Sequence, residues 1–190
     1  MPTFKSAALL QQLEATVQNS VTLTQKLQQT DPAKLTAAPT GAWNALQILQ
    51  HLNSYNQYYL PAMKQALDKA PARGAAEFKA GLLGNYFVKT MLPGSNGAIT
   101  NAMKAPKDHI PAPQFNDRKA MADFITGQQQ LLQIIGRARN ADLTRIKVPI
   151  SISRFLKIRL GDTLRFLVAH QQRHFVQLSN TLADTSFRLQ

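Results

Sequence analysis

Residues 161–177 read GDTLRFLVAHQQRHFVQ, and an apolar residue or a histidine recurs in this stretch every three or four positions. That period is typical of one face of an α-helix, so the sequence predicts a long helix from about Gly161 to Ala183. His170 and His174 lie on its inward face, at positions where a core would otherwise hold leucine. Two histidines at i and i+4 point the same way, at a spacing that can share a metal ion. The predicted inward face consists of Leu160, Leu164, Leu167, His170, His174, Leu178 and Leu182.

The same helical period recurs in the rest of the chain. It predicts long helices over residues 5–29, 40–59 and 119–139, and Pro61 is expected to kink or stop the second of them. A weaker helical signal covers residues 75–91, and the short β-branched segment 148–152 is expected to be extended. Residues 31–41 form a connector. Residues 92–118 form a loop rich in proline and glycine, of the kind that often covers a site. The predicted fold is all-α: one domain, residues 1–190, built as a four-helix bundle with short additional helices and this long proline-rich loop.

The chain is basic, with 22 Lys and Arg against 10 Asp and Glu and a net charge of +12. Nine basic and two acidic residues lie between positions 137 and 173. Such a field attracts nucleic acid, acidic lipid or a small anionic substrate, and a solvated basic surface fits it equally well. No apolar run reaches the roughly 18 residues needed to span a membrane. The N-terminal segment is amphipathic rather than a secretory signal, so we expect a cytoplasmic protein without membrane contact.

A third histidine completes a candidate site. His51 lies on the helix predicted for residues 40–59, between Ile48 and Tyr55 at the helical spacing. The chain has four histidines and no cysteine, so imidazole must supply most ligands of any transition-metal site. Two interpretations fit. The buried rings either form hydrogen bonds within the bundle, or hold a metal with one exchangeable position, as catalytic sites do. The fourth histidine, His109, falls in the proline-rich loop and is expected at the surface rather than as a further ligand.

Two short motifs resemble those of the DinB-like superfamily. Residues 43–52 read WNALQILQHL, with a tryptophan eight residues before His-Leu, and residues 170–177 match the pattern H-x-x-R-H-x-x-Q. The resemblance implies an up-down-down-up four-helix bundle that holds a divalent metal, usually zinc or nickel, through three histidines. Carried over by position, these ligands are His51, His170 and His174. Characterised relatives include transferases and isomerases that use a low-molecular-weight thiol, and the resemblance leaves open a homodimer through the helices.

The favoured function is therefore a metal-dependent S-transferase or hydrolase with a small substrate, which Arg173 suggests is anionic, and a low-molecular-weight thiol as cosubstrate. Such a metal lowers the pKa of a bound thiol or water and so supplies a nucleophile. No Asp or Glu falls within either histidine motif, so the sequence assigns no catalytic base. Trp43 is expected to anchor the core, and Gln177 is placed to orient a ligand ring. The alternative is a non-enzymatic stress-response or binding module whose basic surface contacts nucleic acid or another acidic partner. Nucleic acid is the less favoured partner, because no nucleic-acid-binding motif is recognised.

Overall fold

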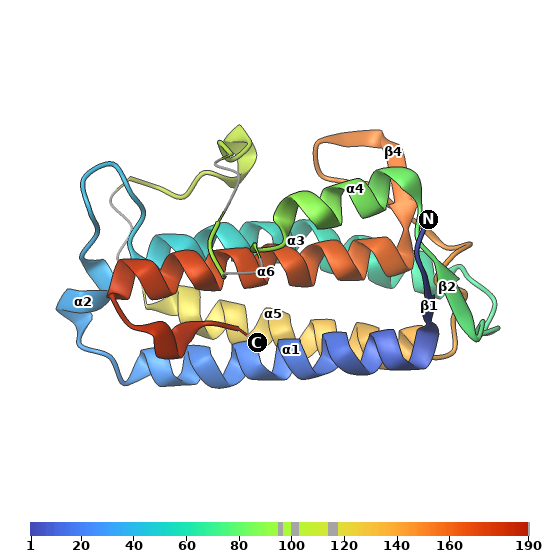
Figure 1. Cartoon of the computed structure of the whole chain (residues 1–190), viewed down its shortest axis with the longest axis horizontal. Helices are drawn as coiled ribbons and strands as arrows, with labels where there is room; N and C mark the ends of the chain where they lie inside the picture. Colours follow the sequence, from blue (N-terminus) through green and yellow to red (C-terminus); the bar gives the residue numbers. More distant parts are fainter. Residues whose placement is uncertain (95–96, 100–102, 114–117, 190) are drawn as a thin grey trace.

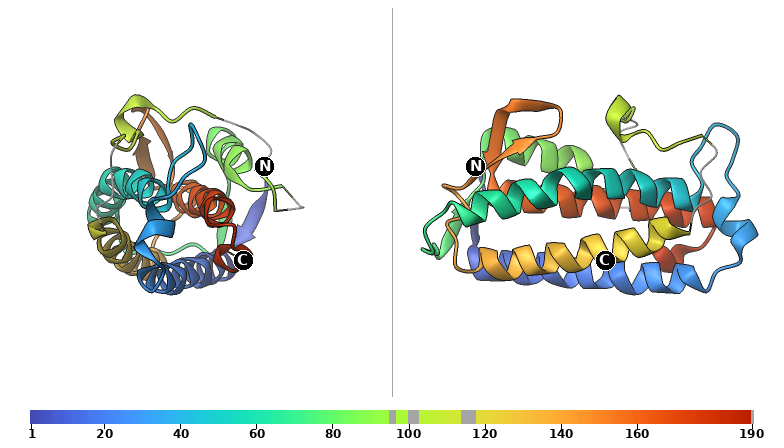
Figure 2. Two further views of the ribbon diagram at one scale, coloured as in Figure 1. Left: turned by 90° about the vertical axis from the view of Figure 1, so that its left-hand side faces the viewer. Right: turned by 180° about the vertical axis from the view of Figure 1, so that it is seen from behind.

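Four long helices lie side by side in the computed structural model, which describes residues 1–94, 97–99, 103–113 and 118–189 (Figure 1). They are α1 (Ser6–Gln28), α3 (Ala45–Asp68), α5 (Lys119–Ala138) and α6 (Leu160–Leu182). Helices α1 and α6 run in one direction and α3 and α5 in the other (Figures 1 and 2). Each of the four packs against its parallel partner and against one antiparallel helix, α1 against α5 and α3 against α6. The prediction of a mostly helical fold is confirmed.

Shorter elements cover both ends and one side of these helices (Figure 1). Strand β1 (Thr3–Lys5) pairs antiparallel with β2 (Glu77–Lys79), and β3 (Lys147–Ile150) pairs antiparallel with β4 (Ser153–Arg159). Helix α4 (Leu82–Met91) lies against α6, outside the four long helices (Figure 2). Three short helical turns complete the described chain: α2 (Pro32–Thr36), η1 (Lys107–His109) and η2 (Thr185–Phe187). Among the described residues, no helix is both long and apolar enough to cross a membrane.

The structure corrects the expected elements in four places. Helix α3 begins at Ala45 rather than near residue 40, because the Asn44 side chain caps it there. Pro61 does not stop α3, which continues to Asp68, because buried Met63 and Leu67 hold the last turns in the core. The N-terminal part of segment 75–91 is strand β2 rather than helix, since it pairs with the start of the chain. Of the segment predicted to be extended, residues 148–150 belong to strand β3 of a hairpin and residues 151–152 to its turn, and the second strand, β4, was not predicted. Part of the proline-rich loop 92–118 lies outside the described residues, and its described part contains η1.

The apolar core consists of two clusters, one toward each end of the four helices. One cluster takes residues 9–17 of α1, 55–67 of α3, 131–138 of α5 and 160–169 of α6. The other takes residues 23–27, 45–52, 120–124 and 175–178 of the same helices. Polar side chains are buried where the two clusters meet, among them Ser20, Gln128 and Gln171. The histidines of α3 and α6 lie at this level. These buried polar residues of the core are therefore gathered around the candidate site.

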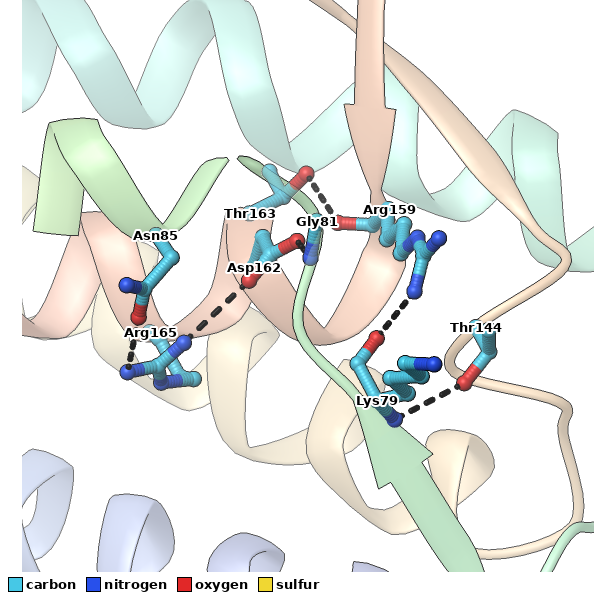
Figure 3. Close-up of polar contacts among 8 residues, drawn as sticks. All are labelled: Lys79, Gly81, Asn85, Thr144, Arg159, Asp162, Thr163 and Arg165. Atoms are coloured by element: carbon cyan, nitrogen blue, oxygen red, sulfur yellow. Dashed lines mark hydrogen bonds and ion pairs between the residues drawn. The ribbon is translucent and has the colours of Figure 1, made fainter. Parts of the chain in front are cut away.

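A buried ion pair at the start of α6, between Asp162 and Arg165, forms hydrogen bonds with α4 and the residue before it (Figure 3). Asp162, in the first turn of α6 as expected, accepts a hydrogen bond from the Gly81 N–H at 2.7 Å and from Arg165 at 3.2 Å. Arg165 also donates to Asn85 of α4 at 3.2 Å. A Cβ on Gly84 would lie 2.4 Å from the Cβ of Asp162, so α4 approaches α6 too closely for any other residue there. Burial raises the pKa of the Asp162 carboxyl, and the Gly81 N–H and Arg165 partly offset this.

Candidate metal centre

His51 reaches the interior because the start of α3 is well defined. The Asn44 side chain accepts a hydrogen bond from the Gln47 N–H at 2.8 Å, and the Gln47 side chain accepts one from the Asn44 N–H at 3.0 Å. This reciprocal cap fixes where the helix begins and hence which face carries His51. Helix α6 packs antiparallel against α3 (Figure 1). It places His170 and His174 beside His51. The three rings are 2%, 3% and 9% exposed, so all are buried.

The three rings direct their Nε2 atoms toward one another. The Nε2 atom of His170 lies 3.2 Å from that of His51 and 3.0 Å from that of His174. One nitrogen atom from each of the three rings lies within 4.8 Å of the corresponding nitrogen atoms of the other two rings. The structure thus brings together the three residues that the sequence singled out, although nearly 120 positions separate His51 from His170 in the chain.

The second nitrogen of two rings fixes where their protons lie. His51 Nδ1 is 2.7 Å from the His109 carbonyl oxygen, and His174 Nδ1 is 2.8 Å from Gln177 Oε1. Both oxygens accept only, so each Nδ1 carries a hydrogen and each Nε2 presents a lone pair to His170. A proton on His170 Nε2 satisfies only one of these lone pairs. A cation held among the three nitrogens satisfies all of them, so this donor set could hold a metal ion.

Burial keeps the three imidazoles neutral near pH 7. It lowers the pKa of His51 to about 4 and that of His174 to about 3, and it lowers the pKa of His170 well below its ordinary value. The mutual repulsion of the rings, were they charged, lowers the pKa of His170 and His174 further. Neutral imidazole is the form that binds metals, so protons compete weakly for these nitrogens.

Acid should destabilise the metal-free protein. Unfolded histidines take up protons below pH 6.5, whereas folded His51 does so only near pH 4. The unfolded state therefore binds more protons in this window, and stability present above pH 6.5 is lost as the pH falls, by roughly 3 kcal/mol from His51 alone. Urea unfolding of chelator-treated protein at pH 7.5, 5.5 and 4.5 measures the loss. His51→Gln should flatten the dependence, and an equal slope in both proteins would contradict the assignment.

The surface position expected for His109 is wrong. Its side chain is 7% exposed, its ring lies over Tyr55 with centroids 3.9 Å apart, and its Nδ1 is 2.8 Å from the Ser54 hydroxyl. The turn η1 folds the loop back over α3, which also places the His109 carbonyl against His51. His109 stands outside the group of converging nitrogens. No local signal marks this contact, because it depends on how the loop folds.

Other residues noted in the sequence lie around the histidines. Trp43 packs against the second apolar cluster, as expected, and its ring centroid is 5.0 Å from that of His51. The Gln177 side chain contacts the His174 ring, which is the contact predicted for it. A cavity of about 910 Å³ opens onto the three rings, and Trp43, Tyr55, Arg173 and Gln177 are among its walls.

The whole arrangement agrees with one protein family. The family model of the DinB superfamily matches residues 12–178, which include all three histidines and the four long helices almost entirely. No curated protein and no solved structure matches the chain. Because the match extends over most of the sequence and both histidine motifs lie within it, the chain belongs to the DinB superfamily.

Proposed function

We propose that the protein is a metal-dependent enzyme, a thiol-dependent S-transferase or a hydrolase, built on an up-down-down-up four-helix bundle. His51, His170 and His174 would hold the metal. The observation that carries this proposal is the convergence of three buried Nε2 atoms at the floor of a large cavity, with two of the rings oriented from behind. Superfamily membership supports it, since DinB-like proteins bind metals.

The donor set favours zinc or nickel. Neutral imidazole suits both metals, and three protein ligands leave a further coordination position for a substrate. When bound, the metal supplies Lewis acidity that activates a thiol or water as a nucleophile. The protein's own part is to hold the three imidazoles neutral, oriented and shielded from bulk water. Burial raises the pKa of Tyr55, beside His51 and His170, to about 12, so Tyr55 stays protonated and can donate a hydrogen bond to substrate.

Removing Gln177 tests the orientation of His174. In Gln177→Ala the His174 Nδ1–H loses its acceptor, and we expect zinc affinity to fall by roughly 10–100-fold, as for other outer partners of metal-binding histidines. Competition with a chromophoric chelator measures the affinity. Asn180→Ala, at an exposed position on the same helix, is the matched control and should bind zinc as the wild type does. Equal affinities of Gln177→Ala and wild type would contradict the role.

Thiol-dependent activity tests the reaction class. Metal-free protein is reloaded with zinc or nickel and mixed with cysteine or glutathione and an alkyl or aryl electrophile, and loss of free thiol is followed. A parallel assay follows ester hydrolysis without thiol. We expect metal-dependent turnover in one of the two assays, its loss in His51→Ala, and its retention in His109→Gln, which keeps the backbone carbonyl that faces His51. No turnover above the His51→Ala background in either assay would overturn the proposal.

The second candidate is a binding module for nucleic acid or another acidic partner, favoured by the net charge of +12. Within the basic stretch, however, Arg137 pairs with Asp68 at 2.6 Å and Arg139 pairs with Glu14, so part of this charge is neutralised. DNA binding that weakens with salt and survives His170→Ala would favour this candidate over the enzyme. For the proposed enzyme we also propose a homodimer that forms through its helices. Sedimentation equilibrium of the purified protein measures this oligomeric state.

A further inference from the structure

The cavity is much longer than a metal centre requires. Its walls on α6 run from Phe166 to Gln177, a rise of about 16 Å along the helix. The cavity volume of about 910 Å³ is near the upper end of the roughly 300–1,000 Å³ typical of small-molecule pockets. His170 and His174 lie between these two limits, so the histidines occupy the middle of the floor and leave room on both sides.

The end toward Phe166 is apolar. The ring centroid of Phe166 on α6 lies 5.8 Å from that of Tyr59 on α3 and 6.3 Å from that of Phe87 on α4. The polar atom of Tyr59 is already engaged, since its hydroxyl accepts a hydrogen bond from the Ser151 N–H at 3.1 Å. Met91 of α4 and Ile158 of the hairpin also line the cavity, and Met91 packs against the apolar cluster that contains Phe166. Such walls stabilise an apolar or aromatic group through the hydrophobic effect.

The other end is cationic. Arg173 and Gln177 of α6 line this end, and Lys104 and Lys107 also line the cavity. These two lysines belong to the loop whose His109 carbonyl contacts His51. Among the described residues that line the cavity, none is acidic. The Arg173 side chain is largely buried, and burial lowers its pKa. The planar fork of a guanidinium carries several N–H donors and matches the two oxygens of a carboxylate.

We infer that the cavity binds an amphiphilic carboxylate, with its apolar body among Tyr59, Phe87 and Phe166 and its carboxylate toward Arg173. The middle of such a molecule passes the three histidines, which is where its reacting atom would lie. That this molecule is a substrate rests on the proposed function. That it binds in this orientation rests only on the walls of the cavity.

Fluorescence of Trp43 reports binding directly. It is the only tryptophan in the chain and lines the cavity beside His51 and His174. Metal-free and zinc-loaded protein are titrated with decanoate and, in parallel, with decyltrimethylammonium, which has the same chain and the opposite charge. We expect saturable decanoate binding to both protein forms, roughly tenfold tighter than binding of the cation, a difference typical of one well-placed charge interaction.

Variants at the two ends separate the contributions. Phe87→Ala and Met91→Ala should each weaken decanoate binding by roughly tenfold, and Arg173→Gln should abolish the preference for decanoate over the cation. Leu82→Ala, exposed on α4, and Arg145→Gln, exposed near the hairpin, are matched controls and should bind as the wild type does. Thermal melts confirm that each variant is folded. With two apolar variants, failure of one to fold still leaves the apolar end tested.

The outcomes distinguish this inference from the proposed function. No saturable decanoate binding, equal binding of the two amphiphiles, or a loss in Leu82→Ala as large as in Phe87→Ala would overturn the inference. If the protein binds zinc but not decanoate, the inferred ligand class is wrong and the proposed function still stands. If the protein binds decanoate with the expected preferences but takes up no zinc or nickel, the inferred ligand class is supported and the proposed metal-dependent function is wrong.

Discussion

Replacing His170 by alanine is expected to lower affinity for zinc or nickel by more than about 100-fold, beyond the usual effect of losing an outer partner. His170 Nε2 is the atom that lies within 3.2 Å of both other Nε2 atoms, so its removal takes away the nitrogen on which the other two converge. Competitive titration gives the affinity, and elemental analysis of the purified proteins gives the metal content. Wild type should retain about one metal per chain, and His170→Ala should retain little.

His109→Gln is the matched control for this prediction. It removes a buried imidazole from the same region but from outside the converging group, so it should keep its metal. His170→Asn, which leaves a smaller void, guards against a loss caused by misfolding. Metal should also stabilise the folded wild type, by about 2.7 kcal/mol at a concentration of 100 Kd, and should not stabilise His170→Asn. A wild type that takes up no zinc or nickel after reloading would sink the central proposal.

Replacing Asp162 by alanine should lower the free energy of unfolding by about 3–5 kcal/mol, because it leaves the partly buried Arg165 guanidinium without its carboxylate. Asp162 is fully buried and receives hydrogen bonds from Gly81 and Arg165, which together hold the start of α4 against α6 (Figure 3). Urea unfolding followed by circular dichroism measures the change. Because α4 carries Phe87, the same variant should also weaken decanoate binding at the apolar end of the cavity.

Two further variants define the cause. Asp162→Asn keeps the shape and one acceptor, so it should cost less, about 1–3 kcal/mol. Asp123→Ala breaks an exposed pair with Lys119 on α5 and should change stability by about 0–1 kcal/mol. If Asp162→Ala costs no more than Asp123→Ala, the buried pair does not stabilise the contact between α4 and α6.

Much of the helical framework could be predicted from the sequence, because the spacing of apolar residues is a local property. The helices predicted over residues 5–29, 119–139 and 161–183 agree with α1, α5 and α6 to within two residues at each end. Prediction failed where distant contacts override local preference. Pro61 remains helical because the turns that follow it are packed in the core, and residues 77–79 form a strand because the N-terminus pairs with them.

The sequence by itself determined that the chain folds into long amphipathic helices and that His51, His170 and His174 belong on inward faces, since both follow from helical periodicity. Only the tertiary structure decided that the three Nε2 atoms converge and that the His109 carbonyl and Gln177 contact two of the rings. It also decided that α4 and the β3–β4 hairpin form walls of the cavity beside them. Except for the contact of Gln177 with its near neighbour His174, these features join residues from separate elements. Their distances are set by how the elements pack and not by any local pattern.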